Sequence, residues 1–174
     1  MSELVLKQEE KEFSPIYDRK SNGHLNNSSK YLSSVAVNLF KMGNIGPEIV
    51  YSEDIPSNSK SSDLLTKMGV FYITALGQGH DFHQGLFGPL PVPDNDTHFS
   101  FAFSFLISDS SNLDKRNRGK SFCILTLSFP KSLEKFFLTR KEIESGLDQY
   151  MQTFKRLEQI KRSHLQELKL FLVY

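Results

Sequence analysis

The sequence of 174 residues has one cysteine, no tryptophan and no long apolar run, and each scarcity limits what the protein can be. Cys123 cannot form an internal disulfide, and its place in an apolar segment predicts a buried, reduced thiol. No segment approaches the roughly 18 apolar residues of a membrane-spanning helix, and no secretory signal opens the chain. We therefore expect a cytoplasmic protein without a transmembrane segment, with peripheral association on endomembranes left open.

The chain also lacks an excess of either positive or negative charge. The chain has 21 basic and 20 acidic residues, for a net charge of +1, so the protein as a whole is not committed to nucleic acid or to an anionic membrane. Any such contact has to be local. Large apolar residues are sparse up to residue 31, which predicts a flexible N-terminal arm over 1–31 and one folded domain over 32–174.

What the sequence does contain is a strongly alternating segment between His98 and Ser108. Large apolar side chains recur at every second position, namely at Phe99, Phe101, Phe103, Phe105 and Ile107. A period of two predicts a strand that covers a core with one face. The later segment SFCILTLSF, residues 121–129, is apolar at almost every position, which is typical of a central strand buried on both faces.

Three further elements are predicted before this pair of strands. Residues 35–40 and 48–52 are rich in β-formers and flank GNIGP, so they should form an antiparallel hairpin. Apolar residues at three- and four-residue spacings predict a helix over 61–76, ended by Gly77. The proline-rich segment that follows can only be a loop or an edge strand, which we place at 85–90.

Two helices are predicted after the central strand. Pro130 should open a short helix over 131–137. Thr139 and Glu142 have the spacing of a capping box, and the apolar periodicity behind them predicts one amphipathic helix of about thirty residues. The expected fold is therefore α+β: a five-stranded, mostly antiparallel sheet with one helix on one face and two helices on the other.

This order of elements and several local sequences resemble longin domains, and most closely the N-terminal longin module of the folliculin and DENN-related group. The residues that carry the resemblance are the Gly46-Pro47 turn, the FGPL segment at 87–90, the strand FSFAFSFLISDS, and Arg118-Gly119 before SFCILTL. The similarity spans about 33–170, whereas the DENN portion and the cysteine-bearing insertion of folliculin have no counterpart.

The resemblance implies an adaptor without cofactors rather than an enzyme. Longin domains dock small Ras-like GTPases and other longin or roadblock domains, in membrane-traffic or nutrient-signalling machinery, and a homodimer is a further option. In the folliculin-like branch an arginine of this connection acts in trans as a finger for a GTPase, which matches Arg118, with Arg116 in reserve. Partner contacts are expected at the edge strand, the basic connection and the end of the last helix: Gly85, Leu86, Phe87, Leu90, Arg116, Lys120, Leu168, Phe171 and Leu172.

Several motifs have simpler interpretations. KRNRGK, residues 115–120, is also typical of a solvated loop, and no aromatic residue interleaves its cations as a nucleic-acid site requires. His80 and His83 lack the further ligands of a zinc site, and we expect His98 and His164 at the surface or its boundary. The glycines of 77–88 lack the Lys-Ser/Thr of a phosphate loop. A small-ligand sensor with a pocket under GPLPVP, residues 88–93, is the third functional alternative.

Overall fold

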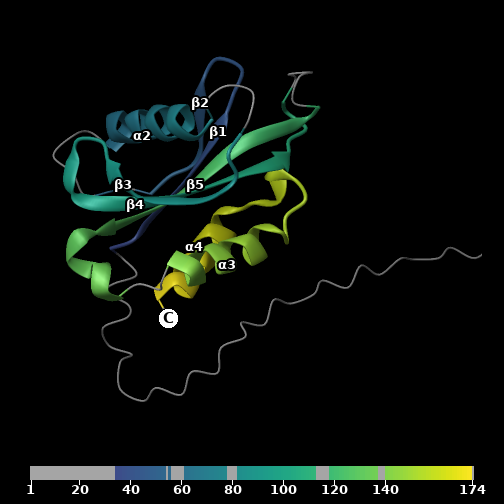
Figure 1. Cartoon of the computed structure of the whole chain (residues 1–174). Helices are drawn as coiled ribbons and strands as arrows, with labels where there is room; N and C mark the ends of the chain where they lie inside the picture. The colour runs from purple at the N-terminus through teal and green to yellow at the C-terminus, as the bar shows by residue number, and fades with distance from the viewer. Residues whose placement is uncertain are drawn as a thin grey trace, which may run out of the picture.

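The computed structural model describes residues 34–53, 55, 61–77, 82–112, 118–136 and 140–173. One antiparallel sheet forms the middle layer. Helix α2 (Ser61–Leu76) covers one face, and helices α3 (Arg140–Met151) and α4 (Arg162–Val173) cover the other, as Figure 1 shows. This is the predicted α+β arrangement of five strands between one helix and two.

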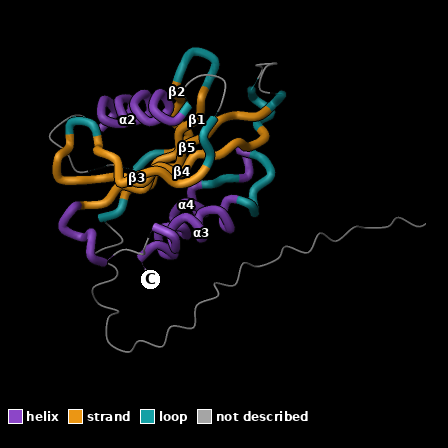
Figure 2. The backbone as a smooth tube through the Cα atoms, in the orientation of Figure 1, coloured by secondary structure: helices purple, strands orange, loops and turns teal. Residues whose placement is uncertain are grey.

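The sheet has the strand order β2-β1-β5-β4-β3, and every neighbouring pair is antiparallel (Figure 2). The strands are β1 (Ala36–Met42), β2 (Pro47–Tyr51), β3 (Gly85–Val92), β4 (Asn95–Ser108) and β5 (Lys120–Pro130). The predicted hairpin and edge strand are both present, each with bounds shifted by one or two residues. Strands β2 and β3 form the two edges.

The pairing of β4 with β5 is the longest in the sheet and confirms the two strongest sequence predictions. It runs without interruption from His98 opposite Pro130 to Ser108 opposite Lys120. Strand β5 is central and buried along nearly its whole length. Cys123 is fully buried there as a free thiol, as predicted, and burial raises its pKa to about 12.

The sheet separates two hydrophobic cores. The alternating phenylalanines of β4 face α3 and α4, where Leu147 and Leu168 are fully buried. On the other face, small residues of β4 such as Ala102 leave space for α2, whose Met68 and Tyr72 are fully buried. The period of two in β4 thus assigns large side chains to one core and small ones to the other.

Helix α2 lies close to the first hairpin because it has a glycine at the point of contact. A Cβ atom built on Gly69 would lie 3.0 Å from Cδ1 of Phe40 and 3.3 Å from Cβ of Pro47. These distances are tighter than ordinary van der Waals contact. The glycine that weakens the helical pattern in the sequence is therefore the residue that allows the helix to approach the sheet.

The prediction of one helix of about thirty residues is wrong. The chain leaves the helical path after Met151, passes through a short 3-10 turn at Leu157–Gln159, and begins α4 at Arg162. Because the two halves of the apolar pattern differ in phase, a straight helix would turn one of them away from the sheet. The break lets Ile143 of α3 and Leu165 of α4 bury in the same core.

Side chains stabilise this break. Oε1 of Gln159 accepts hydrogen bonds from the backbone N–H groups of Lys155, at 2.8 Å, and Arg156, at 2.9 Å. The Tyr150 hydroxyl donates to the carbonyl oxygen of His164 at 2.6 Å and so ties α3 to α4. The exposed backbone donors of Lys155 and Arg156, freed by ending the helix, thus have a partner within the protein.

Two other predictions have mixed outcomes. The short helix after Pro130 is a 3-10 helix at Lys131–Phe136, so the two helices on that face are α3 and α4 instead. Glu142 lies in the first turn of α3. Thr139, the other half of the predicted capping box, lies outside the described residues, as does the whole predicted arm over 1–31.

Candidate functional site

The connection between β4 and β5 positions Arg118, the predicted finger. Arg118 and Gly119 both have left-handed backbones, with φ of 51° and 72°, directly before β5 begins. This conformation is uncommon for a residue other than glycine and clusters at functional sites. The Arg118 side chain is exposed. Residues 113–117, which include the reserve candidate Arg116, lie outside the described part.

A buried carboxylate anchors the base of this connection. The Asp109 side chain is 2% exposed, and its Oδ1 accepts hydrogen bonds from the N–H of Ser111 at 2.9 Å and from its hydroxyl at 2.6 Å. Oδ2 accepts from Ser121 Oγ at 2.7 Å and lies 3.3 Å from Lys41 Nζ. The backbone closes the connection, because Asp109 N–H donates to the Gly119 carbonyl at 2.8 Å.

The surroundings of Asp109 favour the ionised form of its carboxylate. Burial alone raises the pKa of Asp109, but the hydrogen bonds from Ser111 and Ser121 and the charge of Lys41 outweigh it and lower the pKa to about 2. The cluster thus fixes both ends of the connection at neutral pH. The exposed Arg118 therefore follows a connection whose two ends are fixed to each other.

A second connection, between α3 and α4, packs against the first. Ser108 forms an isolated parallel bridge with Arg156, and the Ser110 N–H donates to Oε1 of Glu158 at 3.0 Å. The Ser110 hydroxyl also bonds to Glu158. Sequence reasoning missed this neighbour because it predicted continuous helix there. The only available signal was the phase shift in the apolar pattern.

The predicted docking strand β3 has part of its outer edge occupied by α3. Arg140 donates to the carbonyl oxygen atoms of Leu86, at 2.6 Å, and Gly88, at 3.0 Å, while Glu144 lies 3.5 Å from the Leu86 nitrogen. These backbone groups are unavailable to a partner strand unless α3 moves. Pro89 and Pro91 remove two further donors from the same strand.

The predicted partner-binding side chains divide between surface and core. Leu86 is 3% exposed and Leu168 is 0% exposed, so both are core residues, and their assignment to a partner surface is corrected. Exposed or half-buried positions among the predicted ones are Gly85, Phe87, Leu90, Arg118 and Lys120. Phe171 and Leu172 lie in α4, but their side chains are outside the described part.

The other sheet edge is apolar and exposed. Ile49 is 45% exposed and Val50 is 39% exposed in the centre of β2, and Val70 of α2 is 48% exposed. The turn before β2 places Ile45 at its apex with a fully exposed side chain. The sequence did not indicate this edge, because a short strand that contains Ile and Val has the same pattern whether these side chains are exposed or buried.

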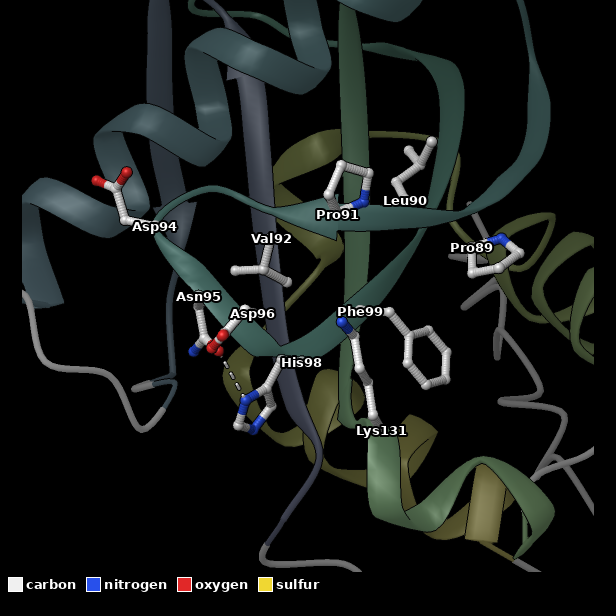
Figure 3. Close-up of a pocket in the computed structure, with 10 residues that line it drawn as sticks. All are labelled: Pro89, Leu90, Pro91, Val92, Asp94, Asn95, Asp96, His98, Phe99 and Lys131. Atoms are coloured by element: carbon white, nitrogen blue, oxygen red, sulfur yellow. Dashed lines mark hydrogen bonds between the residues drawn. The ribbon is translucent and has the colours of Figure 1, made fainter.

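An open depression of about 620 Å³ lies beside the turn that joins β3 to β4, where the ligand-sensor alternative places its pocket (Figure 3). Its lining includes Leu90, Asp96 and Lys131. His98 also lines it and is 7% exposed, so it lies at the boundary of the surface rather than fully on it. Its Nδ1 lies 3.2 Å from Oδ1 of Asn95, and burial lowers its pKa.

Metal ligation has no support in the described part of the chain, where no three His, Cys, Asp or Glu side chains gather as a metal site requires. His83 is exposed there, whereas His80 lies outside it. None of the described helices is long and apolar enough to cross a membrane.

Comparison with known proteins gave no match: no family model fits the chain, and no curated protein and no solved structure is similar to it. The class that the fold defines is an α+β protein built on a five-stranded antiparallel sheet between one helix and two.

Proposed function

We propose that this chain is a longin-like interaction module that binds a small Ras-like GTPase or a second longin or roadblock domain. The observation that supports it most directly is the contrast between the two sheet edges. On β3 the outward carbonyls of Leu86 and Gly88 are bonded to Arg140. On β2 the central residues Ile49 and Val50 are exposed and apolar.

An exposed apolar edge strand is costly for a protein that acts alone, because it can pair with any other strand. A partner that adds a strand or a flat apolar surface at β2 would cover Ile49 and Val50 and use the free backbone groups of the edge. The binding class is therefore protein–protein association, with the adaptor role and the trafficking or nutrient-signalling setting that the longin resemblance suggests.

Co-purification from the native source, with mass spectrometry of what travels with the chain, tests the proposal. We expect a GTPase, a longin or a roadblock protein, and we expect Ile49→Arg to release it. Phe71→Arg is the matched control, because Phe71 is 42% exposed on α2 and lies outside the β2 edge. A strict monomer without such a partner, or a partner that Ile49→Arg retains fully, would contradict the proposal.

The second candidate function is GTPase activation in trans by Arg118. The observation that favours it is the exposed, left-handed Arg118 on a connection whose base is fixed by Asp109. Its guanidinium would neutralise charge that develops on the transferred phosphoryl group while the GTPase supplies the attacking water.

Arg118→Asn tests this function without disturbing the backbone, since Asn accepts a left-handed conformation well. We expect stimulated GTP hydrolysis to fall by about 10³-fold or more, with partner binding nearly unchanged. Lys141→Ala, which removes an exposed positive charge on α3 outside the predicted contact residues, is the control. Unchanged hydrolysis in Arg118→Asn would exclude the finger and leave the adaptor role intact.

A further inference from the structure

Three connections leave the sheet at the same end. Strand β1 enters its turn next to the start of β5, because Lys41 lies opposite Cys123. The β4–β5 connection begins there, and Lys41 contacts Asp109 within it. The α3–α4 connection joins the same end through the bridge between Ser108 and Arg156. Figure 1 shows the β1–β2 turn projecting beyond the sheet, and the described ends of the β4–β5 connection lie at this end as well.

Among the described residues, this end carries more exposed positive charge than negative charge. The exposed cations are Arg118 and Lys120 in the β4–β5 connection and Lys155, Arg156 and Lys161 in the α3–α4 connection. Within the described ranges none of these five forms an ion pair, since every ion pair there involves Lys41, Lys67 or Lys169.

The described carboxylates at this end offset only part of this charge. Asp109 is buried against Lys41, and Glu48 lies 3.4 Å from the same lysine. Glu158 is bonded to the backbone and hydroxyl of Ser110. With Lys41 included, six described cations thus face three described carboxylates, so positive charge is in excess at this end of a chain whose net charge is only +1. Such a local field attracts an anionic surface.

The β1–β2 turn adds an apolar residue to the same end. Ile45 is fully exposed at the apex of the turn, between Gly43 and Gly46. A protruding aliphatic side chain beside exposed cations suits the boundary of a bilayer, where apolar groups enter the acyl region and cations stay with the headgroups.

We propose that this end of the molecule, called here the basic end, binds the surface of a membrane that contains anionic phospholipids. The basic end is defined by Ile45, Arg118, Lys120, Lys155, Arg156 and Lys161. The headgroup phosphates meet the five cations, and Ile45 inserts at the acyl boundary. A nucleic-acid partner is disfavoured, because Phe154, the aromatic residue among the cations of the α3–α4 connection, packs against Tyr150 and His164.

Membrane binding at the basic end leaves the β2 edge free for the proposed protein partner, whereas it would engage Arg118, the residue of the second candidate function. The inference does not rest on that partner, and its variants leave Ile49, Val50 and Arg118 unchanged. A loss of membrane binding and a loss of partner binding can therefore be told apart.

Co-sedimentation of the full chain with vesicles tests the proposal. We expect binding to vesicles of phosphatidylcholine with phosphatidylserine, weak binding to phosphatidylcholine alone, and a decrease as salt rises. Lys155→Glu with Lys161→Glu should weaken binding at least about 20-fold, since each lysine near the surface contributes about fivefold. Lys141→Glu, an exposed lysine on α3, is the control and should bind as the parent does.

Ile45→Ser should lower the affinity for the same vesicles while the salt dependence remains, because it removes the apolar contact and no charge. Circular dichroism of each variant checks that the fold is kept. Equal binding to neutral and anionic vesicles, no binding to either, or full binding by the lysine double variant would overturn the proposal. Competition by soluble inorganic phosphate at concentrations too low to screen charge would also overturn it, because it would indicate a phosphate site rather than a surface.

Discussion

Oγ of Ser121 lies 2.7 Å from Oδ2 of Asp109, and these two residues flank the connection that carries Arg118. Both are buried, although the connection between them is mostly polar in sequence. The hydrogen bond joins the end of β4 to the start of β5 beneath that connection. Its strength therefore bears on both the stability of the fold and the placement of Arg118.

Asp109→Asn should lower the free energy of unfolding by about 1–3 kcal/mol at neutral pH, because it weakens hydrogen bonds to a buried charge and leaves Lys41 without this partner. The pKa of Asp109 lies below its ordinary value of 3.8, at about 2. Its contribution is thus complete above about pH 4 and is lost as the pH falls toward 2. Urea unfolding of both proteins across this range should show curves that converge in acid. Asp96→Asn, an exposed control, should match the parent at every pH.

Gly88→Ala should destabilise the protein by more than about 2 kcal/mol. Gly88 has a φ of 129°, and an added Cβ would lie 2.8 Å from the Ser100 carbonyl oxygen. Thermal unfolding measures the loss. Gly119→Ala is a matched control, since its φ is 72° but no atom lies within 4 Å of the added Cβ. It should cost only the left-handed backbone penalty of about 1 kcal/mol. Equal losses of stability in the two variants would show that the close contact with the Ser100 carbonyl oxygen is unimportant.

The strands were predictable because their signal is local. Alternation in β4 and continuous apolarity in β5 specify a half-buried and a fully buried strand, and the same period assigns Phe103 and Ala102 to opposite cores. The pairing of β1 with β5 was not predicted, since no local pattern reports a contact between Val37 and Leu127. The helix break escaped prediction because Gln159 captures backbone donors that a continuous helix would use internally.

The candidate sites were less predictable, because they depend on contacts between residues that lie far apart in the sequence. Arg118 is a candidate only through the resemblance, whereas Asp109 has the sequence surroundings of a solvated loop and is buried because Lys41 and Ser121 approach from other strands. His98 was expected at the surface or its boundary, and it is 7% exposed beside Asn95, which lies 3.2 Å from its Nδ1. Burial of a polar residue depends on long-range partners, which a single sequence does not show.

Arg140→Ala should increase self-association. The substitution frees the carbonyl oxygen atoms of Leu86 and Gly88 on the edge of β3, and exposed strand edges pair with one another. We also expect a loss of about 1 kcal/mol in the free energy of unfolding. Light scattering at increasing protein concentration measures the association, and Lys141→Ala on the same helix is the control. Identical scattering for Arg140→Ala and the parent would show that this contact does not protect the edge.

Cys123 should resist thiol reagents in the folded protein. Its side chain is fully buried, and burial together with the nearby charge of Asp109 raises the thiol pKa to about 12. Reaction near neutral pH needs the thiolate and access to it, so the native chain should be labelled only through opening of the sheet. Labelling with a chromogenic disulfide reagent should be slow in buffer and fast in denaturant. If opening is global, Gly88→Ala should increase the labelling rate by the same factor by which it increases the equilibrium constant for unfolding. Native labelling as fast as that of the denatured chain would contradict the burial of β5 in the centre of the sheet.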